Sequence, residues 1–335
     1  MRKPVSLSIV AISSLVFSLG LINETDAGLK NPHRLAAILA KRVNKLESAL
    51  LELQSRIACV STTSDHRNIY FEGCNVHVRN GLGGTNSVNA YGNLIVGYDE
   101  ISTPGPGTIP AACSDGKYQD IESCNEAGAT WARSQKTGSH NLVVGAGHSY
   151  TQAAGVVFGG GNVTNRFAAT ATGGFFNVAA GIGAAVSGGL NNQATGGYSS
   201  VGGGDTNRAN GDLSNIGGGS GGMANGAQSS ISGGWNNVTN AQYSSISGGR
   251  AGTTGALGSS ISGGNMNRTN EGEDFSGTFA SISGGLENQT NGAYASVSGG
   301  YRNAADGVNS TIGGGRNRSV SGGFDWRAGG LFEDQ

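Results

Sequence analysis

Apolar residues recur at a fixed spacing along the C-terminal half of the chain. From Ala171 to Ile261 a small or branched apolar residue, in most copies followed by Ser-Gly-Gly or Gly-Gly-Gly, stands at every 15th position. The spacing resumes at Ile282, after the polar insert Glu271–Phe275. We call these residues anchors: Val143, Val157, Ala171, Val186, Val201, Ile216, Ile231, Ile246, Ile261, Ile282, Val297 and Ile312. Such a period predicts a solenoid in which each coil buries its apolar face by stacking on the next.

Two further positions of the repeat are regular. Asn stands six places after the anchor in most coils, and Ala or Thr stands eight places after it. We expect the Asn side chains to hydrogen-bond along the axis as a ladder, because unpaired amides are costly inside a narrow coil. The ladder candidates are Asn177, Asn192, Asn207, Asn237, Asn267, Asn288 and Asn303. The pattern predicts an all-β fold, a parallel β-roll with two short strands per coil.

The predicted interior is only about one side chain wide. One buried Val or Ile contributes about 1.5–3 kcal/mol, whereas ordering the backbone of one coil costs about 15–30 kcal/mol before hydrogen bonds are counted. We therefore expect several copies of the chain to associate. Aromatic residues three places before an anchor form a stripe or cover the seam between copies: Tyr198, Tyr243, Phe279 and Tyr294.

A heptad pattern precedes the repeats. Every a and d position between Ala36 and Val60 is apolar. Candidates for a trimer core are Val43, Leu46, Leu50, Leu53 and Ile57. Arg42 at g would face Glu47 at e of a parallel neighbour, which is a pairing that sets register. The pattern predicts a coiled coil within residues 28–60, with dimer and trimer both open, and one amphipathic helix packed on its own domain as the alternative.

The first 27 residues have the features of a secretory signal. Arg2 and Lys3 precede an apolar run, and Thr25-Asp26-Ala27 offers a small-residue cleavage site. An uncleaved membrane anchor is the alternative, although the run is short for a membrane span. After cleavage we expect no integral membrane segment and an extracellular or cell-surface location.

Residues 61–142 form a transition between the helix and the repeats. The segment NLIVG (Asn93–Gly97) recurs as NLVVG (Asn141–Gly145), so we interpret Ile95 as an early rung and the residues between the two segments as an insertion. The main repeats then occupy residues 143–323, and residues 324–335 form a C-terminal cap or tail containing Trp326.

Four cysteines lie in or near this transition. Proximity in sequence favours the disulfides Cys59–Cys74 and Cys113–Cys124 among three pairings. The second pair would close a small surface excursion. Zinc binding is the alternative, but the paired Cys or His ligands at short spacing that a zinc site needs are missing.

Composition narrows the function further. A formal net charge of −1 gives no electrostatic footprint for nucleic acid. The repeats contain Gly without a strict Gly-x-y triplet, which excludes collagen.

The repeat motif resembles a known family. SVSGGYRNAADG (Ser296–Gly307) and AVSGGLNNQATG (Ala185–Gly196) resemble the YadA-like head repeats of trimeric autotransporter adhesins. The resemblance implies a left-handed parallel β-roll assembled as a homotrimer that binds host matrix or other cells. Two features depart from that family: the coiled coil precedes the roll, and Phe324–Gln335 does not provide the family's C-terminal membrane anchor. We therefore expect release from the cell or attachment through a partner.

The repeats offer little chemistry. They contain no His after His148, no Lys after Lys136 and no Cys after Cys124. The remaining candidates for carbohydrase chemistry are carboxylates, which we interpret as solvated charges: Asp205, Asp212, Glu287, Glu271, Glu273 and Asp274. Only Gly202–Asp205 approaches a calcium-roll turn. We expect no enzyme activity, cofactor or metal.

The function predicted from the sequence is that of a secreted or surface-associated fibrous protein, adhesin-like or an extracellular scaffold. Its expected partners are copies of itself and an extracellular glycan, matrix protein or cell surface. One alternative is a trimeric receptor binder similar to a tail fibre. Another is an ice-binding solenoid, because Ser-Ile-Ser recurs around Ile231, Ile246, Ile261 and Ile282 and would form two files of outward hydroxyls.

Overall fold

The computed structural model describes residues 32–100, 110–114, 118, 120–270 and 278–328. The predicted signal segment and the polar insert Glu271–Phe275 lie outside these residues, as does most of the predicted C-terminal tail. The chain divides into two compact units, Met1–His77 and Val78–Gln335, and each is described by itself.

The described part of the first unit, residues 32–77, contains one helix and one hairpin. Helix α2 (Pro32–Arg56) is 25 residues long and begins at a proline, whose missing N–H is tolerated in a first turn. Strands β1 (Val60–Thr62) and β2 (Ile69–Phe71) pair antiparallel. The disulfide Cys59–Cys74 joins the two ends of this hairpin.

The helix ends earlier than the heptad pattern. Val60, the last predicted d position, lies in β1 and pairs with Phe71. Ile57 lies just beyond the helix, and its N–H still donates to the carbonyl of Leu53 at 3.1 Å. The heptad frame overran the helix because the chain must turn at Cys59 to enter the disulfide-bonded hairpin.

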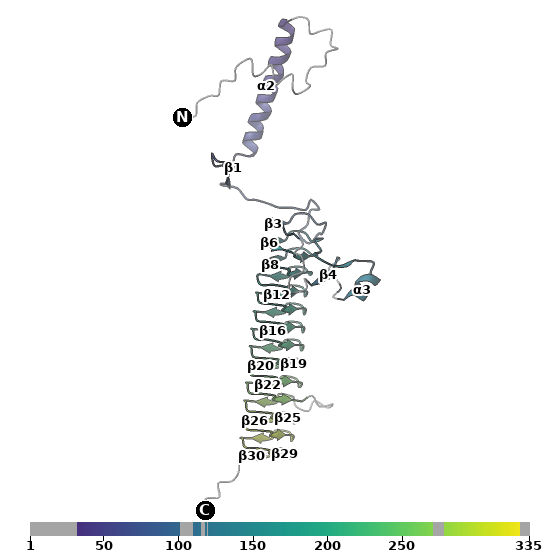
Figure 1. Ribbon diagram of the computed structural model, residues 1–335, viewed down its shortest axis with the longest axis vertical. Coiled ribbons are helices and arrows are strands. Elements are labelled where there is room, and N and C mark those ends of the chain that lie inside the picture. Colours follow the sequence, from purple (N-terminus) through teal and green to yellow (C-terminus); the bar gives the residue numbers. More distant parts are fainter. Residues whose placement is uncertain (1–31, 101–109, 115–117, 119, 271–277, 329–335) are drawn as a thin grey trace, which may run out of the picture. The chain divides into compact units, whose positions relative to one another are not determined.

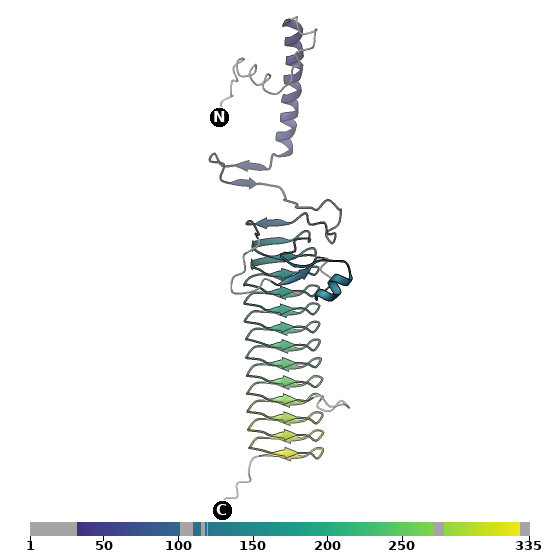
Figure 2. The same cartoon turned by 45° about the vertical axis from the view of Figure 1, so that its right-hand side comes forward.

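The second unit is a parallel β-solenoid, as the period predicted (Figures 1 and 2). Within the described residues, two sheets of 14 and 12 strands run along it. The first sheet comprises β3 (Leu94–Val96), β6 (Leu142–Ala146), β8 (Val156–Gly160), β10 (Thr170–Ala171), β12 (Ala185–Val186), β14 (Ser200–Val201), β16 (Asn215–Ile216), β18 (Ser230–Ile231), β20 (Ser245–Ile246), β22 (Ser260–Ile261), β24 (Ser281–Ile282), β26 (Ser296–Val297), β28 (Thr311–Ile312) and β30 (Trp326–Arg327).

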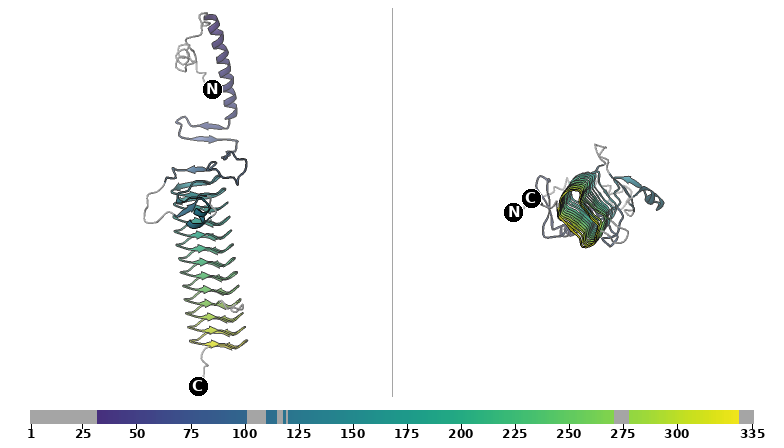
Figure 3. Two further views of the ribbon diagram at one scale, coloured as in Figure 1. Left: turned by 90° about the vertical axis from the view of Figure 1, so that its right-hand side faces the viewer. Right: turned by 90° about the horizontal axis from the view of Figure 1, so that it is seen from below.

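The second sheet carries the small residues that stand eight places after most anchors. It comprises β7 (Ser149–Tyr150), β9 (Val163–Thr164), β11 (Val178–Ala179), β13 (Gln193–Ala194), β15 (Arg208–Ala209), β17 (Met223–Ala224), β19 (Val238–Thr239), β21 (Thr253–Thr254), β23 (Arg268–Thr269), β25 (Gln289–Thr290), β27 (Ala304–Ala305) and β29 (Ser319–Val320). Viewed along the axis, successive coils superimpose (Figure 3). This superposition follows from the constant period, since equivalent residues of neighbouring coils pair directly, as Ile231 does with Ile246.

The core is the line of anchors between the two sheets. Ile216, Ile231, Ile246, Ile261 and Ile282 are at most 1% exposed. The second sheet faces them with small residues such as Ala224 and Thr239, which are fully buried. A larger residue on either side would force the sheets apart, since the interior is packed to crystal-like density.

The early rung is also present. Strand β3 pairs in parallel with β6, which aligns Ile95 with Val143. The prediction that NLIVG and NLVVG stack as neighbouring rungs is therefore confirmed.

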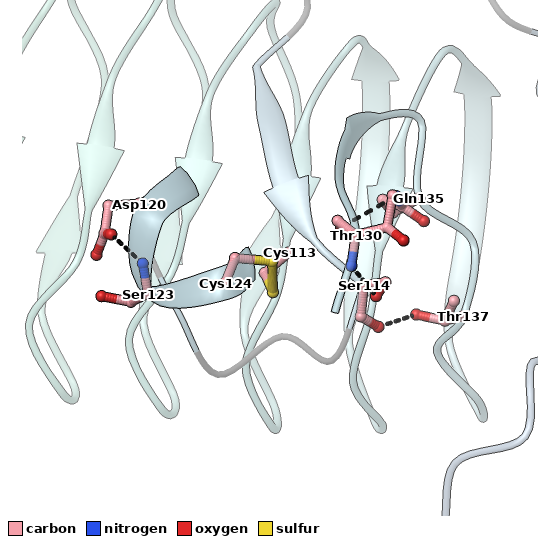
Figure 4. Close-up of a disulfide and its surroundings, with 8 residues drawn as sticks. All are labelled: Cys113, Ser114, Asp120, Ser123, Cys124, Thr130, Gln135 and Thr137. Atoms are coloured by element: carbon pink, nitrogen blue, oxygen red, sulfur yellow. Dashed lines mark hydrogen bonds between the residues drawn. A yellow bond between two sulfur atoms is a disulfide. The ribbon is translucent and has the colours of Figure 1, made fainter. Parts of the chain in front are cut away.

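Between these two rungs, residues 110–114 and 120–133 form an excursion from the stack (Figure 4). Strands β4 (Ala111–Cys113) and β5 (Trp131–Arg133) pair antiparallel, and helix α3 (Ile121–Glu126) lies between them in sequence. Asp120 caps α3 by accepting the N–H of Ser123 at 2.8 Å. The disulfide Cys113–Cys124 links β4 to α3, and both sulfurs are buried.

The repeat extends beyond the predicted boundary at residue 323. Strand β30 pairs with β28, which places Trp326 beside Thr311 and Arg327 beside Ile312. Trp326 therefore belongs to the last rung rather than to a separate cap. Arg327 takes the anchor position and is exposed, because a guanidinium is not buried in an apolar interior without a partner.

Candidate functional site: the ladder and corners of the solenoid

The Asn side chains form a ladder through the backbone. The side-chain nitrogen Nδ2 of Asn192 donates to the carbonyl oxygens of Gly188 at 3.0 Å and Gly204 at 2.9 Å. The side-chain oxygen Oδ1 of Asn192 accepts the backbone N–H of Asn207 at 3.0 Å. The bonds of this ladder run between side chain and backbone rather than from one Asn side chain to the next. Each Asn satisfies its own amide and ties its coil to the next.

The other predicted ladder residues are placed in the same way. Their side chains are at most 1% exposed. The members are Asn177, Asn192, Asn207, Asn237, Asn267, Asn288 and Asn303, and Asn162 joins them upstream. Glycine takes the position twice, at Gly222 and Gly252, whose N–H groups donate to the preceding Asn. The last acceptor, Asn303, receives the N–H of Arg318.

The ladder begins with two titratable residues. His148 takes the place of an Asn: its Nδ1 accepts the N–H of Asn162 at 3.2 Å, and its Nε2 lies 3.2 Å from the carbonyl oxygen of Val144. The N–H of His148 donates in turn to Oδ1 of Asp99 at 3.2 Å. These contacts require a neutral imidazole with its proton on Nε2.

This head of the ladder also fixes the excursion. Asp99 follows the early rung, and its carboxylate lies 3.1 Å from Nζ of Lys136, near the end of the excursion. Asp99, His148 and Tyr150 are at most 2% exposed. Burial lowers the pKa of His148, although the Asp99 carboxylate opposes this shift. Burial and the same carboxylate raise the pKa of Tyr150 to about 12. The cluster joins both ends of the excursion to the first complete coil.

Each coil turns at two corners where one residue is left-handed. We define the mixed corner by its residue pairs: Phe175–Phe176, Leu190–Asn191, Asp205–Thr206, Ser220–Gly221, Trp235–Asn236, Arg250–Ala251, Asn265–Met266, Leu286–Glu287, Tyr301–Arg302 and Arg316–Asn317. The second residue of each pair has a positive φ, between 51° and 66°. Charged, amide and aromatic side chains alternate here. Arg250 lies 4.4 Å from the ring centroid of Trp235, and Arg316 lies 5.4 Å from that of Tyr301.

The apolar corner is built differently. Its pairs are Phe167–Ala168, Ile182–Gly183, Gly197–Tyr198, Asp212–Leu213, Ala227–Gln228, Gln242–Tyr243, Leu257–Gly258, Thr278–Phe279, Ala293–Tyr294, Val308–Asn309 and Gly323–Phe324. The second residue of each pair is again left-handed. Every pair except Ala227–Gln228 contains a large apolar residue. The predicted aromatics Tyr198, Tyr243, Phe279 and Tyr294 lie on this corner and are 53–67% exposed.

The outward hydroxyls lie on the strands of the first sheet and one residue after them. Ser230, Ser245, Ser260, Ser281 and Ser296 are paired neighbours along one file and are half-buried. Ser232, Ser247, Ser262, Ser283 and Ser298 form the second file and are exposed. The parallel register sets these hydroxyls about 4.7–4.9 Å apart along the axis.

The candidate carboxylates are not brought together. Asp205 lies on the mixed corner, and Asp212 on the apolar corner, where it accepts the N–H of Gly197 at 2.7 Å. Glu287 forms an ion pair with Arg302. Glu271, Glu273 and Asp274 lie outside the described residues. In the described part of the chain, no group of three or more His, Cys, Asp or Glu side chains is arranged to hold a metal ion.

The helix keeps its apolar heptad positions on the surface of the chain. Val43, Leu46, Leu50, Leu53 and Ile57 are 37–66% exposed. This exposure differs from what a helix packed on its own domain would show. Within the described residues, no helix is long and apolar enough to cross a membrane.

Sequence reasoning missed the residues at the head of the ladder. It also missed that an apolar residue precedes the left-handed position of the apolar corner wherever that position is small. The signal for His148 was its spacing of 14 residues from Asn162, which matches the spacing of Val143 and Val157. The signal at the apolar corner lay in the residue four places before the anchor. Where the residue three places before the anchor is Gly, Ala or Asn, the one before it is Phe167, Ile182, Leu257 or Val308.

The sequence matches no protein-family model, and no curated protein matches it either.

Proposed function

We propose that this chain is a secreted or surface-associated, non-enzymatic fibrous protein that acts as a homotrimer in adhesion or as an extracellular scaffold. The observation that carries the proposal is the solenoid itself, in which a sealed interior supports a surface that repeats with every coil. Repeat architectures of this kind use extended surfaces rather than pockets for binding. Two disulfides support an oxidising, extracellular location.

Support for self-association comes from the exposed heptad positions of α2. Parallel helices would bury Leu46, Leu50 and Leu53 against one another, as a and d residues do in coiled coils. A homotrimer would also present several identical solenoids to one target, so weak contacts would add up through avidity.

The mixed corner is the surface we propose for a glycan or matrix-protein ligand. The guanidinium of Arg250 lies over the ring of Trp235, and that of Arg316 lies over the ring of Tyr301. Trp235 is 45% exposed. Exposed rings and polar groups in alternation suit the apolar faces and hydroxyls of a sugar. The family resemblance of the repeats supports the same assignment.

The test is binding of the exported chain to an array of glycans and matrix proteins. We expect binding to at least one class of ligand, weakened at least tenfold by Trp235→Ala and unchanged by Ser247→Ala, a control on the first sheet. Binding that survives Trp235→Ala in full would place the ligand elsewhere. The non-enzymatic assignment would be overturned if the chain released reducing ends from polysaccharides and Asp205→Asn or Glu287→Gln abolished that release.

The Ser files favour a second candidate, binding of ice. Two parallel rows of hydroxyls on a flat sheet are able to order water along the surface. The test is thermal hysteresis at high protein concentration. A difference between the melting and freezing temperatures that is abolished by Ser247→Tyr and Ser262→Tyr would support ice binding. If the parent chain shows no such difference, the ice-binding function is wrong.

A further inference from the structure

The strongest unexplained feature of the surface is the line of large apolar side chains on the apolar corner. We name this line the apolar ridge: Phe167, Ile182, Tyr198, Leu213, Tyr243, Leu257, Phe279, Tyr294, Val308 and Phe324. Apart from Leu257, which is intermediate, each is exposed by 42–81%. We propose that the apolar ridge is the surface through which copies of this chain meet, in parallel and in register.

The backbone at the ridge makes these side chains unexpected. Tyr198, Tyr243, Phe279 and Tyr294 have φ between 54° and 61°, a left-handed conformation that costs residues with a Cβ about 1–2 kcal/mol. Asn and Gly adopt it more readily. At its left-handed positions the mixed corner uses Asn three times and Gly once, and the apolar corner uses Gly twice and Asn once, so both corners also place other residue types in this conformation. An aromatic ring that is strained and more than half exposed gains little within the single chain beyond contacts such as the stacking of Phe279 on Tyr294, so burial against another molecule would supply the compensation.

The ridge is also maintained where the left-handed residue is small. Gly183, Gly258 and Asn309 would each leave a gap in the line of apolar groups. In each case the preceding residue is Ile182, Leu257 or Val308. The apolar group is thus preserved while its position within the corner shifts by one residue, and among the described corner pairs only Ala227–Gln228 interrupts the line. This pattern indicates that apolar contact matters along most of the solenoid.

The chemistry of the ridge fits a second copy of the chain. Among the described corner pairs, Asp212 is the single charged residue of the apolar corner, whereas the mixed corner carries Asp205, Arg250, Glu287, Arg302 and Arg316. An open groove of about 550 Å³ on this corner is lined by Ile182, Tyr198 and Leu213, with Arg166, Thr195 and Asp212 also on its wall. Only a partner with the same coil spacing contacts every rung, and a parallel copy has that spacing by identity.

The area of the ridge is sufficient. Large side chains of this type expose on the order of 100 Å² each when half-exposed, so the ridge offers about 1,000 Å² per copy, against the ~800 Å² per partner of a stable interface. The exposed heptad positions of α2 are an independent sign of self-association in the same chain. This inference rests on the oligomer of the proposed function and specifies which surface of the solenoid forms it.

Cysteine cross-linking of the exported chain tests the assignment. The two disulfides leave no free thiol to interfere. Tyr243→Cys places a thiol on the ridge, and Asn236→Cys places one on the mixed corner at a similar φ. Under mild oxidation we expect a covalent dimer band from Tyr243→Cys in a denaturing, non-reducing gel, and at least tenfold less from Asn236→Cys.

A second pair of variants tests the energetics. Tyr243→Asn with Tyr294→Asn removes two ridge rings while keeping residues that accept the left-handed backbone, and Met266→Asn is the matched control on the mixed corner. We expect association by light scattering to weaken at least tenfold for the double variant only, with circular dichroism unchanged.

The outcomes separate the two proposals. An oligomer that cross-links equally at both corners, or only through Asn236→Cys, overturns the ridge interface and leaves the oligomer standing. A monomeric parent chain overturns the oligomer itself and the ridge interface with it.

Discussion

At both corners of a coil one residue adopts a left-handed backbone, yet the two corners carry different side chains. The mixed corner carries charged, amide and small residues among apolar ones such as Phe175 and Trp235, and it is followed directly by the Asn ladder, which holds it with hydrogen bonds. The apolar corner is followed by a buried Ser or Ala in most coils, such as Ser244 and Ala295, and carries large apolar groups. The left-handed backbone is common to both corners, whereas the surroundings of each corner select its side chains.

The largest expected effect concerns the backbone that leads into the mixed corner. Gly234 has φ +92°, and a Cβ there would lie 2.2 Å from the carbonyl oxygen of Gly249 in the next coil. Gly234→Ala should lower the free energy of unfolding by about 4 kcal/mol, from left-handed strain and overpacking together. Chemical denaturation followed by circular dichroism measures this loss.

Gly233→Ala is the matched control. A Cβ at Gly233 meets no atom within 4 Å, and its φ is not in the left-handed region. Its denaturation midpoint should stay close to that of the parent chain. Equal losses for the two neighbours would show that the coils separate easily and that close stacking does not define the corner.

The second effect removes the ladder beside the mixed corner. Asn192→Ala deletes two donated hydrogen bonds and leaves the buried N–H of Asn207 without its acceptor. We expect a loss of about 2–3 kcal/mol, because an unsatisfied buried group keeps its full desolvation cost. Loss of hydrogen-exchange protection at Asn207 locates the effect, and full protection there would contradict it.

The reciprocal change fills a gap in the ladder. Gly222 stands where other coils carry Asn, so the N–H of Asn237 has no Asn side chain in the preceding coil to accept it. Gly222→Asn should raise stability by about 1 kcal/mol. A lower denaturation midpoint would mean that the close contact between the new Cβ and Oδ1 of Asn207, 3.0 Å apart, is not relieved.

The repeats made much of this architecture predictable from sequence. The anchors, the second strand and the early rung at Ile95 follow from periodicity, because in-register stacking requires identical spacing. The left-handed corners do not follow from it, since Tyr243 and Phe279 are residues that avoid positive φ in isolation. The head of the ladder escaped for another reason: Asp99 and Lys136 come together only when the excursion returns to the coil.

The third effect is a dependence of stability on pH at the head of the ladder. It distinguishes the ladder from both corners, because it comes from His148. Burial lowers the pKa of His148 below its ordinary value of 6.5. Below pH 6.5 the unfolded chain therefore binds a proton at His148 more readily than the folded chain does. The contribution of neutral His148 to stability is complete above this pH and is lost as the pH falls through the pKa of His148 in the folded chain. Asp99, Lys136 and Tyr150 are the titratable groups around the ring.

His148→Asn isolates this titration. Asn makes the same ladder contacts in later coils but carries no ionisable group. The protection factor of the Asn162 amide, which is its exchange rate relative to an unstructured amide at the same pH, should fall between pH 7 and pH 5 in the parent chain and stay constant in the variant. A variant that retains the parent's pH dependence would assign the titration to another group.

The smallest effects come from matched pairs of left-handed residues in neighbouring coils, one pair on each corner. Phe279 and Tyr294 stack on the apolar corner with ring centroids 5.6 Å apart, and Glu287 pairs with Arg302 on the mixed corner. Double-mutant cycles should give the aromatic pair a coupling of about 0.5–1.5 kcal/mol. The ion pair is solvated, so its coupling should be smaller and should disappear in salt. Because both pairs bridge one coil spacing with the same backbone, the comparison isolates side-chain chemistry, and an ion-pair coupling that equals the aromatic one would show that the two corners do not differ energetically.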